Sequence, residues 1–150
     1  MKLNCEVIVD ASLEDVWTAF DDAQNLHRWQ QNFVSCSQKA GTPGQPGSVA
    51  ELTYDENGKK VVLTETIAER REKEFLVSSY ESPYGSTLIV NRFEAIDASS
   101  TRWTSWCNFK FRGVMKIMSA FSGGAIRKRT EGDMQRFKIV VESDLAGAQR

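Results

Sequence analysis

Polar and apolar residues alternate over positions 2–9, a period of two that predicts a strand with one apolar face. Over 12–21 the period lengthens, because Leu, Val, Trp and Phe stand three, one and three positions apart and share one helical face. Ser12, followed by acidic residues, begins this helix in the manner of a capping box. Residues 25–29 have the spacing of a second, shorter helix that Asn25 caps. The chain therefore opens with a strand and two small helices.

Strand-like segments separated by short turns occupy the middle of the chain. The expected strands cover residues 33–39, 49–54, 60–69, 75–80, 86–96 and 101–111. Asn57–Gly58 is a strong hairpin signal between the second and third of them. Gly41–Gly47 lacks the nucleotide-binding glycine patterns, so we interpret it as a loop. Consecutive strands with short connections predict an antiparallel meander.

The strand 101–111 has mostly apolar residues at its odd positions, so we expect that face to be concave and to meet a helix. The turn that connects it to the preceding strand leaves two registers open. A two- or four-residue loop pairs Glu94 with Trp103 and turns Arg92 and Glu94 inward. A three-residue loop pairs Phe93 with Ser105 and turns both charged side chains outward.

The last predicted element is an amphipathic helix that starts near Ser119 or Gly124 and ends near Asp144. The apolar stripe of this helix includes Met134 and Phe137. Because glycine disfavours helix, the Gly123–Gly124 pair predicts an irregular or kinked start. The basic run at 127–129 is followed by acidic residues, and we interpret it as a solvated helix face.

Composition narrows the class of protein. The chain has 150 residues, of which 41% are hydrophobic, 26% charged and 10% aromatic, and this predicts a single globular domain over 1–150. The formal net charge of -1 argues against a dedicated binder of nucleic acid. No run approaches the roughly 20 apolar residues of a membrane-spanning helix, and the start lacks a signal-peptide core, so we expect a cytoplasmic protein without stable membrane insertion.

Candidate chemistry is sparse. One histidine and three widely spaced cysteines offer no metal site and no nucleophile with an adjacent base, so we expect neither a metal nor another cofactor. His27 is a weak candidate for acid–base catalysis from a cavity mouth. Glu65, which shares a strand face with Leu63 and Ile67, is a second weak candidate, because an apolar pocket raises a carboxyl pKa. Tyr80 and Tyr84 are possible hydrogen-bond partners of a ligand carbonyl.

Four segments carry a resemblance to a known family. They are the opening VIVDASLEDVWTAF, the segment NLHRW, the pair NRFEAID and TRWT, and the ending RKRTEGDMQRFK. With the order of elements, they resemble the START/Bet v 1-like (SRPBCC) superfamily, in its polyketide cyclase/dehydrase-like branch. The resemblance implies an α+β helix-grip fold, in which a curved antiparallel sheet wraps a long C-terminal helix and two short helices follow the first strand.

The resemblance also implies an apolar cavity between sheet and helix that binds a lipid-, polyketide- or quinone-like molecule. The side chains expected to contact this ligand are Trp29, Ile67, Trp103, Ser105, Cys107, Phe109, Phe111, Met118, Phe121, Met134 and Phe137. One alternative is a cofactor-free cyclase or dehydratase that uses the same cavity. Another is a protein-interaction module like the chaperone co-activator relatives. A monomer and a homodimer both remain open.

Overall fold

The computed structural model describes residues 1–149, with the side chains of 115–122 excepted. The elements are β1 (Lys2–Val9), α1 (Leu13–Asp21), the 3-10 turn η1 (Ala23–Asn25), α2 (Leu26–Trp29), β2 (Phe33–Ala40), β3 (Val49–Glu56), β4 (Lys59–Arg71), β5 (Phe75–Ser82), β6 (Gly85–Asp97), β7 (Ser100–Phe111) and α3 (Val114–Ala148). They form the α+β helix-grip arrangement that the sequence predicts.

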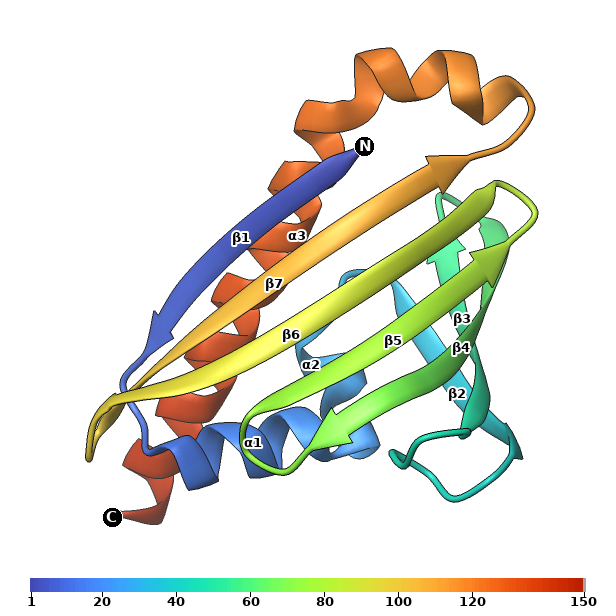
Figure 1. Ribbon diagram of the computed structural model, residues 1–150. Helices are drawn as coiled ribbons and strands as arrows, with labels where there is room; N and C mark the ends of the chain where they lie inside the picture. Colours follow the sequence, from blue (N-terminus) through green and yellow to red (C-terminus); the bar gives the residue numbers. More distant parts are fainter. Residues whose placement is uncertain (150) are drawn as a thin grey trace.

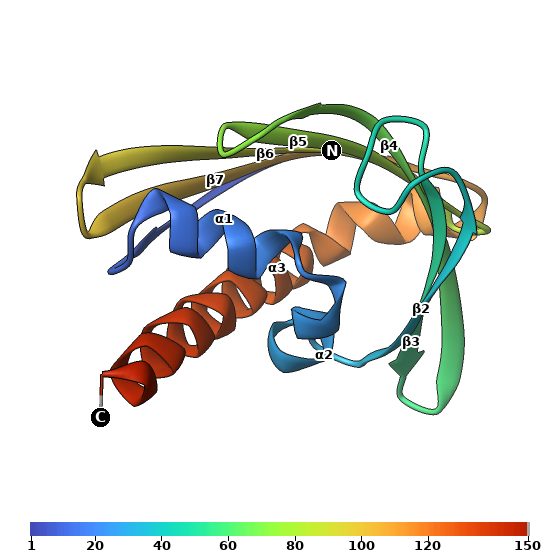
Figure 2. The ribbon, with the colours of Figure 1, turned by 90° about the horizontal axis from the view of Figure 1, so that it is seen from below.

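One antiparallel sheet with the strand order β1-β7-β6-β5-β4-β3-β2 curves around the helices. Figure 1 shows α3 crossing the concave side of this sheet, and Figure 2 shows α1 and α2 on the same side. α3 packs chiefly on β1 and α2, whereas α1 lies against β6 and β7. All three helices therefore cover one face of the sheet.

Local chemistry explains where the first helices begin. The Ser12 side chain accepts a hydrogen bond from the backbone N–H of Asp15 at 3.1 Å, so the predicted cap of α1 is confirmed. The prediction for Asn25 is wrong in detail, because its side chain makes no capping bond to α2. Its amide donates instead to the carbonyl of Ala19 at 3.1 Å, which ties α2 back to α1.

The register between β6 and β7 differs from both predicted alternatives. Phe93 lies opposite Trp103, and Glu94 lies opposite Arg102. The turn itself has two residues, but a bulge at Ile96 shifts the ladder by one position. Arg92 and Glu94 therefore point outward, as the three-residue loop predicted, although by a different pairing.

The C-terminal helix is longer than predicted. It begins at Val114 and not at Ser119 or Gly124. Its first third runs at an angle to the remainder, so the expected kink is present although the early helix start was missed (Figures 1 and 2).

An aromatic cluster fills the end of the concave face beneath α1. Trp103 stands at its centre, with ring centroids 5.0 Å from Phe137, 5.4 Å from Phe20 and 5.9 Å from Phe93. Trp29 joins from α2, 5.7 Å from Trp103. Burial of these large rings supplies much of the hydrophobic stabilisation and fixes α1 and α2 against the sheet.

Candidate functional site

A cavity of about 410 Å³ lies beside the aromatic cluster, within the volume range of small-molecule sites. Its apolar lining comes from the sheet and all three helices, namely Phe20, Leu26, Trp29, Ala50, Leu52, Ile67, Leu76, Ile89, Trp103, Cys107, Phe109 and Met134. Its polar lining includes the half-buried or buried Gln30, Ser48, Glu65, Tyr80, Asn91, Ser105, Thr130 and Asp133, and the exposed Gln38. Exposed lining residues from α1, η1, β2 and the loop after β2 mark its opening.

The structure brings most of the predicted ligand-contacting residues to this cavity. Those that line it are Trp29, Ile67, Trp103, Ser105, Cys107, Phe109 and Met134. Phe111 and Phe137 are not among the lining residues. Phe137 is fully buried in the aromatic cluster, and Phe111 stacks on Phe109 at a centroid distance of 6.0 Å. Met118 and Phe121 lie in the segment whose side chains fall outside the described residues.

Glu65 and Tyr80 form a polar pair on the cavity wall. They lie opposite each other on β4 and β5, and the Tyr80 hydroxyl donates to Glu65 Oε2 at 2.6 Å. Burial raises the pKa of the Glu65 carboxyl, an effect that the Tyr80 hydrogen bond partly opposes. Burial, followed by the nearby Glu65 charge, also raises the pKa of Tyr80 well above its usual value. The pair can therefore accept a hydrogen bond from a ligand or exchange a proton with it.

A second set of polar groups is already satisfied by neighbours. Trp103 Nε1 donates to Asn91 Oδ1 at 2.9 Å, so both buried groups are paired. The Ser105 hydroxyl lies 3.7 Å from the Cys107 sulfur, and burial raises the pKa of that thiol. Ser105 and Cys107 are therefore part of the cavity wall, and neither is an activated nucleophile.

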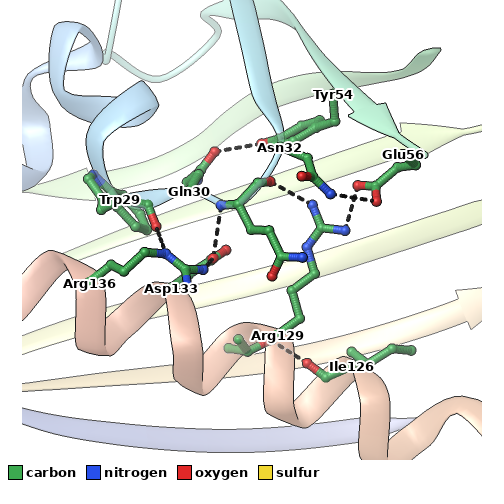
Figure 3. A network of polar contacts seen from close by, with 11 residues as sticks. Trp29, Gln30, Asn32, Tyr54, Glu56, Ile126, Arg129, Asp133 and Arg136 are labelled. Atoms are coloured by element: carbon green, nitrogen blue, oxygen red, sulfur yellow. Dashed lines mark hydrogen bonds and ion pairs between the residues drawn. The ribbon is translucent and has the colours of Figure 1, made fainter. Parts of the chain in front are cut away.

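Figure 3 shows a polar network between α3 and the segment after α2, in which Gln30 and Asp133 also line the cavity. Gln31 N–H donates to Asp133 Oδ1 at 3.0 Å, and Arg136 pairs with the same carboxylate. Arg129 bonds the Gln31 carbonyl at 2.8 Å and Glu56 at 2.5 Å. The network joins the turn after α2 to α3 and to the β3–β4 hairpin.

Asp133 also contributes to the cavity lining. Burial raises the pKa of its carboxyl, and the hydrogen bond from Gln31 and the charge of Arg136 partly offset this rise. Sequence reasoning missed this role, because the segment around 127–133 was interpreted as a solvated face. Half-buried Arg129 contradicts that interpretation in part. The amphipathic stripe offered one available signal, since Asp133 directly precedes buried Met134.

Arg70 contacts two residues that line the cavity at its opening, Asp21 and Gly44. Its guanidinium bonds both carboxylate oxygens of Asp21, at 2.5 and 2.7 Å, and the carbonyl of Gly44 at 3.2 Å. It also lies over the Trp17 ring, 5.1 Å from the centroid, and its side chain is 8% exposed. Asp21 and Gly44 line the cavity, so this arginine connects β4 with α1 and the loop after β2 at the opening.

The other candidate groups lie elsewhere. His27 is exposed and is not among the cavity-lining residues. It borders a surface hollow with Phe33 and Val34 that adjoins the cavity opening, since Ala23, Cys36, Gln38 and Pro43 line both. Tyr84 is in the β5–β6 turn and is not among the lining residues. Glu65 is therefore the one weak catalytic candidate that the described structure places at the cavity.

Comparison with known proteins agrees with this geometry. The model of the family described as "Polyketide cyclase / dehydrase and lipid transport" matches residues 2–139. Searched against curated proteins, the chain finds no match.

Solved structures show the same fold at low sequence identity. The Zhui aromatase/cyclase from Streptomyces sp. R1128 is 14% identical, with a TM-score of 0.82 over 97% of this chain and 95% of that one. TTHA0849 from Thermus thermophilus is 14% identical, with a TM-score of 0.79 over 96% and 99% of the two chains. Ara h 8.0201 is 14% identical, with a TM-score of 0.74 over 95% and 98%. Within the described residues, no helix has both the length and the apolar character needed to cross a bilayer.

Proposed function

Because this chain belongs to the family of polyketide cyclases/dehydrases and lipid-transport proteins, we propose that it binds a hydrophobic or aromatic small molecule in the cavity between the sheet and the C-terminal helix. The observation that carries the proposal is the cavity itself, about 410 Å³ with Trp29 and Trp103 in its wall. A space of this size with mixed apolar and polar lining suits a small amphipathic molecule better than a purely aliphatic one.

Fluorescence of the neutral dye phenylnaphthylamine tests this proposal. We expect its emission to rise and to saturate when the protein is added, as the dye leaves water for an apolar site. Ala50→Phe places a ring in the cavity, because Ala50 is buried and lines it, so this variant should lose dye binding.

The matched control is Val62→Phe, which adds a ring at an exposed position of β4 and should bind the dye like the parent. Circular dichroism confirms that both variants fold, and Leu52→Phe provides a second cavity-filling change. Dye binding that persists unchanged in both filled variants contradicts the proposal.

A second candidate function is catalysis of a cyclase or dehydratase kind in the same cavity. The specific observation in its favour is the Glu65–Tyr80 pair, a titratable couple on the cavity wall beside the apolar side chains of Leu52 and Ile67. Folding a flexible poly-β-keto chain beside a proton donor would promote ring closure and loss of one water.

Mass spectrometry of a β-keto thioester mimic incubated with the protein tests this function. Catalysis predicts a product that has lost one water, formed by the parent protein and much more slowly by Glu65→Gln. Equal rates with both proteins, at saturating mimic, argue against a catalytic role of Glu65.

An interaction module has less support. Exposed large apolar side chains in the described part of the chain are spread over β1, β2, β4, β6 and α3. These positions include β1 and β2, the two opposite edges of the sheet, so the described ones do not all belong to one docking patch.

A further inference from the structure

The cavity lining has charge of only one sign. Within the described residues it includes the carboxylates of Asp21, Asp22, Glu65 and Asp133, and it contains no lysine, arginine or histidine. A ligand in this cavity therefore meets carboxylates but no cationic lining side chain among the described residues.

Three of these carboxylates already have strong partners. Asp21 is held by both guanidinium nitrogens of Arg70. Asp22 accepts the backbone N–H of Gln24 at 2.9 Å. Asp133 accepts from Gln31 and pairs with Arg136. These groups are committed to structure at the edges of the cavity.

Glu65 differs from them. Among the described side chains its hydrogen-bond partner is the Tyr80 hydroxyl, and that bond uses one of about four acceptor positions of a carboxylate. Glu65 lies between Ala50 of β3 and Tyr80 of β5, and it shares the cavity with Leu52 and Ile67. The same apolar surroundings raise the pKa of its carboxyl.

Trp29 lines the same cavity as a ring and not as a donor. It is 6% exposed, and its indole Nε1 is buried away from the open space, without a partner among the described residues. A ligand therefore meets aromatic surface at Trp29 and a hydrogen-bond acceptor at Glu65.

Building on the proposed binding function, we propose that the cavity selects an uncharged or cationic aromatic ligand whose hydroxyl or amino group donates to Glu65, and that it excludes carboxylates. A ligand carboxylate would meet Glu65 without a cation to pair with it, because Arg70 and Arg136 are already engaged by Asp21 and Asp133. A hydroxyl or ammonium group would instead use the acceptor positions that Tyr80 leaves free. The family relationship does not dictate this choice, since it follows from the side chains of this cavity.

Three naphthyl ligands of similar size and shape, which differ in the charge of their polar group, test this selectivity. Naphthylethylamine, naphthylethanol and naphthylacetic acid are titrated into the protein at pH 7 by calorimetry. We expect the amine and the alcohol to bind at least about tenfold more tightly than the acid, since like-charge contact in a desolvated site is strongly unfavourable. Glu65→Gln keeps the size of the side chain, so it should weaken the amine about tenfold and strengthen the acid.

The matched control is Glu69→Gln, which removes a charge from an exposed position of the same strand and should leave all three affinities unchanged. Binding of the acid as tight as that of the alcohol overturns the inference, as does an unchanged amine-to-acid ratio in Glu65→Gln. So does failure of all three ligands while phenylnaphthylamine still binds. If the dye does not bind either, the proposed binding function itself has failed.

Discussion

β1 and β4 belong to the same sheet, yet their inner faces meet different surroundings. The inward residues of β1, Leu3, Cys5, Val7 and Val9, are at most 5% exposed and pack toward α3. On β4, Glu65 is only half-buried and faces the cavity. The strict apolar alternation of β1 marks the packed side of the molecule, and the mixed Thr-Glu-Thr-Ile run of β4 marks the cavity side.

The comparison shows that one end of the concave face is packed and the other is hollow. Aromatic rings fill the space beneath β6 and β7 and fix the helices there, and Trp29 and Trp103 of this cluster also form the boundary of the cavity. The cavity side has fewer apolar contacts and more polar groups, which suits recognition of a ligand. The following variants test that division, beginning with the largest expected effect.

Removing a ring from the packed side should have the greatest cost. Phe137→Ala is expected to lower the free energy of unfolding by about 3–5 kcal/mol, because a fully buried ring at the centre of the aromatic cluster leaves a void. Leu52→Ala, at a buried position beside the existing cavity, should cost about 2 kcal/mol, since its side chain has fewer contacts to lose. Urea unfolding of both variants gives the comparison, and equal losses would contradict it.

Enlarging a buried side chain should destabilise the packed side more than the cavity side. Ala11→Leu is expected to lower the free energy of unfolding by about 1–3 kcal/mol, because Ala11 is buried among packed core residues. Ala50→Leu should be close to neutral, because its added carbons enter the cavity. Chemical denaturation measures both changes. A similar penalty at the two alanines would mean that the cavity side has no spare room.

The link between the two sides should contribute less. Arg70 joins β4 to Asp21 of α1 and is almost fully buried, whereas Asp21 remains partly exposed. A double-mutant cycle with Arg70→Met and Asp21→Asn is expected to give a coupling free energy of about 1 kcal/mol. Additive effects of the two changes would show that this ion pair does not fasten the opening.

The smallest effect should be a pH dependence on the cavity side. The pKa of the Glu65 carboxyl is higher in the folded protein than in the unfolded chain. As pH rises, the unfolded chain therefore releases the carboxyl proton first. The free energy of unfolding falls over the pH range between these two pKa values. Glu65→Gln should therefore gain stability relative to the parent as pH rises, with the gain vanishing at low pH. Urea unfolding at several pH values measures it, with Glu69→Gln as the control for loss of charge. A stability difference that does not change with pH contradicts the expected titration.

The sequence predicted the elements well because their signals are local. Alternation, the Ser12 cap and the Asn57–Gly58 step depend on neighbours in the chain, and each appears in the structure. The face of Glu65 was also predictable from its position two residues before Ile67. The role of Asp133 was not, because its burial depends on Gln31 and Arg136 meeting it across the fold.

The bulge at Ile96 has a consequence for how the chain tolerates changes in length. Asp97 pairs with Ser100 and Ala95 pairs with Thr101, so Ile96 stands outside the ladder between them. Deleting Ile96 would leave all of these pairs in place and keep Phe93 on the inner face. A deletion in the paired part of β6 would shift its register by one residue, and the shifted side chains would move to the opposite face of the sheet. This chain should therefore tolerate the loss of one residue at this tip while the inner face of the sheet stays the same.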